Sequence, residues 1–321
     1  MEYALPTPAA PLKIGTRGSP LALAQAHETR GRLMEAFDLP EEAFEICVIK
    51  TTGDDRTLID ADIALKTIGN KGLFTKEIEE AMIDRRIDIA VHSTKDMPVE
   101  QPAGLVLDVF LPREDVRDAF VSLKYASIAD LPQGAVVGTS SLRRRAQLQV
   151  KRPDLKLVEF RGNVQTRLQK LADGVADATF LAMAGLNRMN MTDVPAHAIA
   201  PEDMLPAIAQ GTIGIEYRAD DLRARQMLAK LHHPETGLRL AAERAFLAAL
   251  DGSCETPIGG LAMLEGTQLW LRGEILSPDG QIVFTGERRG PVGGGAAMGR
   301  DLAEELLDQA GPDFFKAVAE G

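Results

Sequence analysis

The chain has 321 residues, of which 45% are apolar and 26% are charged, and these fractions are typical of a soluble globular protein. Its net charge of -11 argues against general binding to nucleic acid, and no apolar run approaches the ~18 residues that a membrane span requires. Two cysteines exclude a disulfide framework, and the N-terminal residues show no signal-peptide pattern. We therefore expect a cytoplasmic protein of two or three domains.

The first third of the chain alternates between short apolar strands and helices. Ser19 has the side chain of a good helix N-cap and Pro20 is well suited to a first helical position. The elements expected here, in chain order, are a strand over 12–15, a helix over 20–37, a strand over 44–49, a helix over 73–86, and strands over 87–91 and 106–110.

The middle of the chain continues this alternation. Strands are expected over 135–138, 155–160 and 178–182, with a helix ending near Val150 and another over 164–172. Alternating strands and helices predict parallel sheets with right-handed crossovers. The proline-containing stretches 98–112 and 195–206 are typical of domain boundaries.

The pattern changes after Asp221. A helix over 237–250 leads into a polar turn, and three antiparallel strands are expected over 261–264, 268–273 and 281–290. A last helix is expected over about 300–319, after a run of glycines at 293–295 that is typical of a flexible loop. These elements predict a small α+β domain.

The two cysteines lie in different environments. Cys47 belongs to an apolar strand, where a thiol usually serves as inert filling, whereas Cys254 lies in a polar, glycine-containing turn. An accessible turn cysteine can become a thiolate nucleophile. An isolated loop cysteine is more often inert than reactive. Whether Cys254 is a nucleophile must therefore be judged from the rest of the sequence.

Positive charge is concentrated between Ser141 and Lys170, where nine basic residues face two acidic ones, so this window carries +7 and the remainder of the chain -18. Three turns between a strand and a helix carry arginines, at 15–19, 138–144 and 160–163. Helix N-termini and arginines both bind carboxylates and phosphates. Any one arginine is most simply a solvated surface charge, but three such turns favour an anion-binding cleft. At 143 and 144, a neutral residue is expected to fold equally well.

A second group of titratable residues follows the apolar strand at 87–91. Asp96 lies just past its end, where α/β sheets carry catalytic groups, and could stabilise a cation or exchange protons. The alternative is a surface ion pair between Asp96 and Lys95.

The chain resembles the porphobilinogen deaminase family, also called the hydroxymethylbilane synthases. Each matching segment is weak alone, but together and in the same order they are highly specific. They are residues 16–23, 71–77, 90–96, 113–120, 138–144, 161–168, 210–211 and 252–259.

The resemblance implies three domains. Domain 1 would comprise 11–112 and 212–230, domain 2 would comprise 113–206, and domain 3 would comprise 232–321. The first two would be α/β domains like type II periplasmic binding proteins, with mixed, mainly parallel sheets, and the third a small α+β domain.

The resemblance also assigns roles to residues. Cys254 would hold a dipyrromethane cofactor by a thioether bond, and Asp96 would be the catalytic carboxylate. The residues implied to bind the cofactor are Lys71, Ser141, Arg143, Arg144 and Arg161. Those implied to contact substrate are Arg17, Phe74, Arg161, Arg167 and Gln210. A further lysine of the family corresponds to either Lys66 or Thr67, and Arg145 has no implied role.

The implied reaction joins four porphobilinogen molecules head to tail into the linear tetrapyrrole hydroxymethylbilane and releases ammonia, as a step of tetrapyrrole biosynthesis. The partners would be this small molecule and the growing oligopyrrole, with neither nucleic acid nor membrane, and the enzyme would be a monomer. The basic window suits this chemistry, because every added pyrrole carries two carboxylates.

Two other functions remain open. A solute-binding module of the same sheet architecture would carry no covalent ligand. A transcriptional regulator with a binding-protein-like sensor would need a helix-turn-helix segment, which neither terminus offers. An intact-mass measurement distinguishes the enzyme from both, because only the enzyme carries additional covalent mass.

Overall fold

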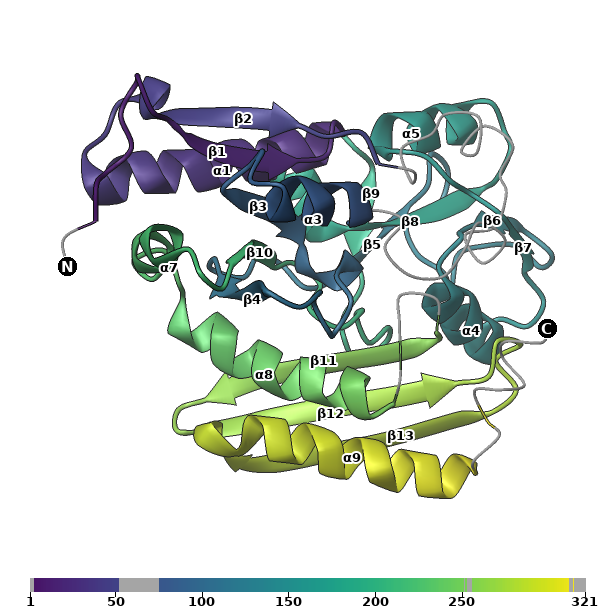
Figure 1. Ribbon diagram of the computed structural model, residues 1–321. Coiled ribbons are helices and arrows are strands. Elements are labelled where there is room, and N and C mark those ends of the chain that lie inside the picture. The colour runs from purple at the N-terminus through teal and green to yellow at the C-terminus, as the bar shows by residue number, and fades with distance from the viewer. Residues whose placement is uncertain (1–2, 52–74, 251, 253–255, 312–313, 315–321) are drawn as a thin grey trace. The chain divides into compact units, whose positions relative to one another are not determined.

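The computed structural model describes residues 3–51, 75–250, 252, 256–311 and 314. The described residues form two compact units (Figure 1). The first unit draws on residues 3–51, 75–114 and 212–237, and the second on 115–211 and on the chain from 238 onward. Two separate sheets belong to the second unit, and the three-domain division expected from the sequence stays a prediction.

The first unit is built on a five-stranded sheet in the order β2-β1-β3-β10-β4. β1 is parallel to both β2 and β3, whereas β10 is antiparallel to both β3 and β4. The sheet is therefore mixed and mainly parallel, as expected. Its strands are β1 (Leu12–Thr16), β2 (Phe44–Val48), β3 (Ile89–Ser93), β4 (Leu105–Phe110) and β10 (Ile213–Arg218).

Helices cover both faces of this sheet. One face packs against α1 and α7, through residues such as Leu33 and Met227, and the other packs against α3 through Ile78 and Met82. The helices are α1 (Pro20–Phe37), α3 (Lys76–Ile83) and α7 (Leu222–Leu228), and the short 3-10 turns are η1 (Glu41–Ala43) and η4 (Thr94–Asp96). The expected start of α1 is confirmed, because Ser19 Oγ accepts a hydrogen bond from the amide of Ala22 at 3.3 Å.

The second unit contains a five-stranded sheet with the same pattern, in the order β7-β6-β8-β5-β9. β6 is parallel to β7 and β8, while β5 is antiparallel to β8 and β9. Its strands are β5 (Asp118–Val121), β6 (Val136–Gly138), β7 (Lys156–Val158), β8 (Ala178–Ala182) and β9 (Ala196–Ala198). Its helices are α4 (Leu142–Lys151), α5 (Val164–Ala172) and α6 (Met183–Arg188). Two hydrophobic clusters, one around Phe120 and Phe180 and the other around Phe160, form its core.

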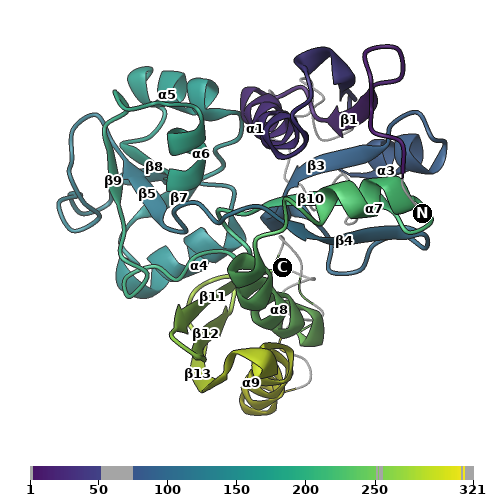
Figure 2. The same ribbon diagram turned by 90° about the vertical axis from the view of Figure 1, so that its left-hand side faces the viewer.

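A three-stranded antiparallel sheet, β11-β12-β13, completes the second unit. Figures 1 and 2 show α8 and α9 on the same face of this sheet. Gly299 of α9 permits their close approach, because a Cβ at this position would lie 2.3 Å from the carbonyl oxygen of Ala242. The elements are α8 (Pro234–Ala249), β11 (Ile258–Glu265), β12 (Gln268–Leu276), β13 (Val283–Pro291), η5 (Val292–Gly294) and α9 (Gly295–Ala310).

The last helix differs from its expected position. It begins at Gly295, inside the glycine run that was expected to form a flexible loop, and it ends at Ala310. Gly311 follows with a positive φ of 84° that glycine adopts readily, and its amide donates to the carbonyl of Leu307 at the end of the helix. Among the residues that the structure describes, no helix is both long and apolar enough to cross a membrane.

Candidate active site

Two of the predicted residues lie at the same edge of the first unit's sheet. Arg17 follows β1 and Asp96 lies in the turn that follows β3, and these strands are parallel neighbours paired through Ile14 and Ile89. The carboxyl ends of parallel strands meet at one edge of a sheet, which is where ligands bind in open α/β folds. Arg17 and Asp96 therefore lie at the edge where a ligand was expected, and the N-terminus of α1 lies at the same edge.

The turn that carries Asp96 is fixed by hydrogen bonds on both sides. Thr94 donates its amide to the carbonyl of Thr212 at 3.0 Å, and the amide of Met97 closes the turn on Thr94 at 3.1 Å. Asp96 itself is half-buried, and no hydrogen bond or ion pair joins its carboxylate to any side chain in the described part of the chain, Lys95 included. A fixed carboxylate that no described side chain neutralises is suited to receive a cation.

A buried polar pair lies beneath this turn. His92 Nε2 is 3.1 Å from Glu216 Oε2, and both side chains are almost completely removed from solvent. Nearby, burial and the negative charge of Glu216 raise the pKa of Glu79. This pair was not predicted from the sequence, because its two members are 124 residues apart and join only when β10 pairs with β3.

The predicted anion-binding residues of the second unit gather at the start of α4. Ser141 caps this helix by accepting the amide of Arg144 at 3.5 Å. Arg143 and Arg144 are both buried, and both pair with the carboxylate of Asp118, at 2.8 Å and 2.6 Å. Their positive charges hold the pKa of Asp118 well below its usual range despite its burial. One carboxylate thus serves two guanidinium groups.

Arg143 has more hydrogen-bond partners than is usual for the exposed first turn of a helix. Its Nη1 donates to the carbonyl of Leu205 at 2.8 Å and to Gln147 at 2.9 Å. The buried pair argues against the expectation that a neutral residue would fold equally well at this position, because such a residue would leave the buried Asp118 carboxylate with one fewer cation. Arg143 Nε is buried and has no hydrogen-bond partner among the described residues.

Further positive charge lies beside this pair. Arg167 donates from Nε to the carbonyl of Gly162 at 2.9 Å, and it shares the carbonyl of Phe180 with Arg144. Burial, followed by the charges of Arg144 and Arg161, lowers the pKa of Arg167 to about 10. Arginines brought this close repel one another, so the cluster of Arg143, Arg144, Arg161 and Arg167, in which Asp118 pairs with the first two, favours binding of anionic groups.

The strongly basic window of the sequence is partly neutralised in the folded protein. Arg145 pairs with Glu159 at 3.1 Å and donates to the carbonyl of Thr139, which gives this arginine a structural role. Arg152 is bound by Asp154 at 2.7 Å. The positive charge available to a ligand is therefore smaller than +7 and is concentrated in the four-arginine cluster.

Gln210 was predicted to contact substrate, but its side chain contacts other residues of the second unit. Its side chain is buried, and Nε2 donates to the carbonyl of Val116 at 2.8 Å and to Asp118 Oδ1 at 3.1 Å. The amide therefore holds Asp118, the carboxylate shared by the two arginines. The role of Asp118 was missed from the sequence, because β5 was not expected as a strand.

The remaining predicted residues, Lys71, Phe74 and Cys254, lie outside the described residues, as do the alternatives Lys66 and Thr67. The elements on either side of Cys254 are defined. α8 ends at Ala249 and β11 begins at Ile258, and the amide of Gly252 returns to the carbonyl of Leu247 at 3.0 Å.

Glu274 on β12 faces α4 and accepts a hydrogen bond from Gln147. Burial raises its pKa, although Gln147, Arg143 and Lys151 act in the opposite direction. A carboxyl with a raised pKa binds its proton more tightly in the folded protein. It therefore favours folding fully below the unfolded pKa of ~4.3, and this contribution is lost as the pH rises through the folded pKa.

We expect Glu274→Gln to raise the melting temperature at pH 8 by roughly 1–3 °C, because the amide still accepts from Gln147 but cannot ionise. Thermal melts between pH 4.5 and 8 should show this gain shrinking toward acid pH. Glu265→Gln, which removes a surface ion pair with Arg289 on the same sheet, is the matched control. A gain that is equal at all pH values would contradict the interpretation.

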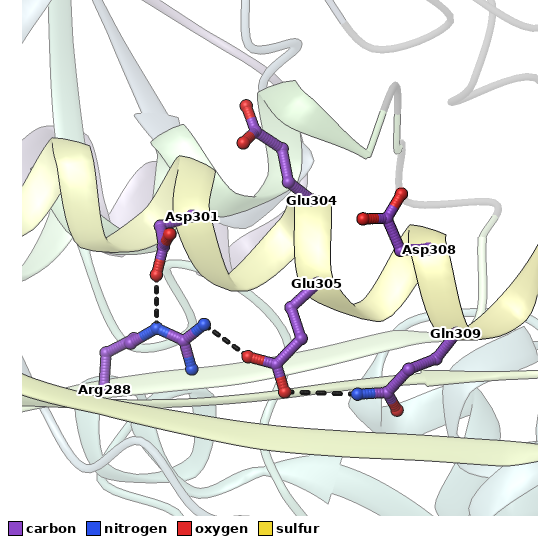
Figure 3. A pocket seen from close by; sticks show the side chains of 6 residues that line it. All are labelled: Arg288, Asp301, Glu304, Glu305, Asp308 and Gln309. Atoms are coloured by element: carbon purple, nitrogen blue, oxygen red, sulfur yellow. Dashed lines mark hydrogen bonds and ion pairs between the residues drawn. The ribbon is translucent and has the colours of Figure 1, made fainter.

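An open pocket also lies on the C-terminal helix, away from the predicted residues. Figure 3 shows Arg288 reaching from β13 to Asp301 and Glu305 of α9, with Asp301 Oδ2 2.5 Å from Arg288 Nε. This surface is acidic and its one arginine is already paired, so it is unsuited to a polycarboxylate ligand.

Two family models match the chain. Residues 12–226 match the porphobilinogen deaminase dipyrromethane cofactor binding domain, and residues 238–308 match the porphobilinogen deaminase C-terminal domain. Among known proteins, the chain is 66% identical over 311 residues to a porphobilinogen deaminase of Paracoccus denitrificans, covering 97% of this chain and 98% of that protein. It is 53% identical to a chloroplastic porphobilinogen deaminase of Pisum sativum, covering 95% and 84%.

Solved structures give more distant likenesses. A putative methionine-binding lipoprotein of Bacillus subtilis is 12% identical, with a TM-score of 0.41 over 70% of this chain and 91% of that chain. A periplasmic binding protein of Salmonella typhimurium with high arginine specificity is 16% identical, with a TM-score of 0.39 over 68% and 91%. Likenesses of this order say nothing about function, and the fold rests on the strand order and pairing described above.

Proposed function

The chain belongs to the porphobilinogen deaminase family, and on this basis we propose which of its residues carry the reaction. The reaction is hydroxymethylbilane synthesis: four porphobilinogen molecules are joined head to tail into a linear tetrapyrrole, with release of ammonia. The enzyme uses a dipyrromethane cofactor. When bound, this cofactor supplies the nucleophilic pyrrole carbon from which the chain is extended.

The four-arginine cluster supports the assignment of the binding residues. Each pyrrole of cofactor, substrate or product carries two carboxylates, and the cluster holds four guanidinium groups, two of which pair with the carboxylate of Asp118. The buried Arg143 Nε, which lacks a partner among the described residues, is a donor of the kind that a ligand carboxylate would satisfy. The residues present therefore fit the cofactor, and Ser141, Arg143, Arg144 and Arg161 would hold it together with Lys71.

Asp96 is the proposed catalytic carboxylate. Loss of ammonia from the aminomethyl group of porphobilinogen leaves positive charge on an electron-rich pyrrole. A fixed, half-buried carboxylate near that charge stabilises it and can take up the protons that leave during coupling. The hydrogen-bonded turn that carries Asp96 supports this role, since a rigid group loses little energy to reorganisation.

The other proposed contacts belong to substrate. Arg17, at the same sheet edge as Asp96, would bind a carboxylate of the incoming porphobilinogen, and Arg161 and Arg167 would contact substrate in the second unit. Phe74 is proposed from sequence alone. Gln210 would act through Asp118, which its amide contacts. Cys254 would attach the cofactor through a thioether bond.

Porphobilinogen is the substrate that family membership supports. We propose further that the enzyme is a monomer in the cytoplasm. The three domains predicted from the sequence, 11–112 with 212–230, 113–206 and 232–321, remain our proposal for its organisation.

The activity is tested directly by incubating the purified protein with porphobilinogen. We expect one ammonia for each porphobilinogen consumed, a linear tetrapyrrole as product, and an intact mass larger than that of the polypeptide by two linked pyrroles. A solute-binding module would bind porphobilinogen without consuming it and would show the bare polypeptide mass.

Arg167→Gln should separate binding from folding. It removes one of three mutually repelling cations, so the melting temperature of the adduct-free protein should stay within about 2 °C of the parent or rise. Loss of a charge-assisted contact worth ~1.5–3 kcal/mol should raise the KM for porphobilinogen by at least ~10-fold.

The control for this variant is Arg152→Gln, which removes an arginine of the same window that pairs with Asp154 and with the backbone carbonyls of Ile128 and Leu131. Its KM should remain that of the parent. Steady-state kinetics and thermal melts measure both quantities, and an unchanged KM in Arg167→Gln would remove this residue from the substrate site.

A further inference from the structure

Asp118, at the start of β5, pairs with both arginines at the start of α4. Its carboxylate is completely buried, with Oδ2 2.8 Å from Arg143 Nη2 and Oδ1 2.6 Å from Arg144 Nη2. Two cations share one anion, so this trio keeps a net charge of about +1. A ligand carboxylate would complete its neutralisation.

The backbone explains how Asp118 reaches this place. It is the first residue of β5, which runs antiparallel to β8 and pairs it with Ala182, the last residue of β8. The reversed direction of β5 brings its first residue to the edge where the parallel strands end. Arg144 uses the same edge, since its Nη1 donates to the carbonyl of Phe180 at 3.1 Å.

Asp118 is itself held by the turn at 209–211. Gln210 Nε2 donates to Asp118 Oδ1 at 3.1 Å and to the carbonyl of Val116 at 2.8 Å. The preceding residue, Ala209, has φ of 60°, a left-handed backbone conformation that residues other than glycine rarely adopt. Such a conformation persists only where the surroundings enforce it.

Glu243 of α8 enforces that conformation. Its carboxylate is fully buried, and its two oxygens accept the amides of Ala209 at 2.7 Å and of Ala262 on β11 at 2.8 Å. α8 and β11 are the two elements that flank the segment containing Cys254. A continuous series of hydrogen bonds and ion pairs therefore joins these elements, through Ala209 and Gln210, to Asp118 and its arginines.

We propose that Asp118 is a positioning residue that orients Arg143 and Arg144 toward the carboxylates of the cofactor and growing chain, and that Glu243 fixes Asp118 in register with the elements flanking Cys254. This inference rests on the proposed function, in which the two arginines bind those carboxylates. By neutralising one of the two cations, Asp118 also prevents the pair from capturing small inorganic anions in place of the ligand.

The first experiment needs no activity. In a Cys254→Ala background, verified free of adduct by intact mass, Asp118→Asn is compared with Asp154→Asn, which removes the same charge from a surface pair with Arg152. Sulfate replaces chloride at equal ionic strength. Sulfate should raise the melting temperature of Asp118→Asn by at least ~3 °C more than that of the control, because the unneutralised arginines bind it in the folded state. Equal responses would overturn the proposed charge balance.

The second experiment uses the chain with Cys254 intact. Adduct formation, followed by intact mass after addition of porphobilinogen, should be at least tenfold slower in Asp118→Asn than in Asp154→Asn, and the KM of the loaded fraction should rise at least tenfold with a smaller change in kcat. Values within twofold of the control would overturn the proposal. If the parent protein forms no adduct and consumes no porphobilinogen, the proposed function fails, and the sulfate comparison still decides whether Asp118 balances the arginines.

Glu243→Gln extends the test if Asp118→Asn does not melt cooperatively. This change keeps one acceptor oxygen but turns an amino group toward a backbone N–H, and it touches neither arginine. We expect a threefold rise in KM with kcat retained and with the parent's response to sulfate, because the Asp118 charge remains. An unchanged KM in this variant would contradict the proposal that Glu243 fixes the position of Asp118.

Discussion

Replacing Cys254 with alanine should remove both the covalent adduct and all measurable turnover. The proposed thioether bond anchors the cofactor and thereby the growing chain through every coupling cycle, so a protein without this sulfur has nothing to extend. Arginine contacts alone cannot substitute, because a bound but unattached primer would leave with its product. Intact mass of Cys254→Ala should equal the bare polypeptide, and porphobilinogen consumption should be absent.

Cys47→Ala is the matched control. Cys47 lies on β2, beside Gly15 of β1, and burial is the main cause that raises the pKa of its thiol. A thiol with a raised pKa is mostly protonated and is a poor nucleophile. The Cys47 variant should therefore carry the adduct and turn over porphobilinogen as the parent does. An adduct that survives in Cys254→Ala and disappears in Cys47→Ala would exchange the two assignments.

The sequence predicts the regular elements well where local signals agree. α5 and β8 have the expected bounds, and α1 begins at the expected cap because serine and proline at its start both favour a helix. Periodicity and capping are properties of neighbouring residues, so they can be interpreted without knowledge of the fold.

Three strands that organise the sheets were not predicted. β5, β9 and β10 are short or lack alternation, and β10 is buried along its whole length with Gly214 and Glu216 in its interior. A glutamate and a glycine inside a strand contradict its usual composition. Glu216 is accommodated only because His92 lies beside it on β3, a contact that a local pattern cannot contain.

The same limitation applies to the candidate site. Arginines at strand-to-helix turns correctly predicted a concentration of positive charge, but Asp118 lies 25 residues before Arg143 and reaches it only through the antiparallel β5. Burial cannot be read from a local pattern either, so Arg143 and Gln210 were both expected to bind ligand in the cleft, and their contacts with Asp118 were not predicted. Charge patterns indicate what a site can bind, whereas tertiary pairing determines which charges remain for the ligand.

Asp96→Asn should reduce turnover by at least ~100-fold, the usual scale for a positioned electrostatic or acid–base group. Asparagine has nearly the same shape and can occupy the same turn, which is held by backbone hydrogen bonds of Thr94 and Met97 rather than by the Asp96 side chain. The variant therefore loses the charge with little change in the fold. If charge is what matters, Asp96→Glu, which keeps the charge but displaces it by one methylene, should have intermediate turnover.

Turnover of these variants must be compared at equal cofactor occupancy, because an enzyme without its primer is inactive for a different reason. Intact mass gives the loaded fraction, and kcat is then calculated for that fraction alone. Asp84→Asn, which removes a charge from an exposed ion pair with Arg86 in the same unit, should leave kcat unchanged. If Asp96 takes no part in the chemistry, Asp96→Asn should turn over at the parent's rate. A loaded Asp96→Asn enzyme with the parent's kcat would therefore exclude Asp96 as the catalytic group and direct the search to another carboxylate at the carboxyl ends of β1 and β3.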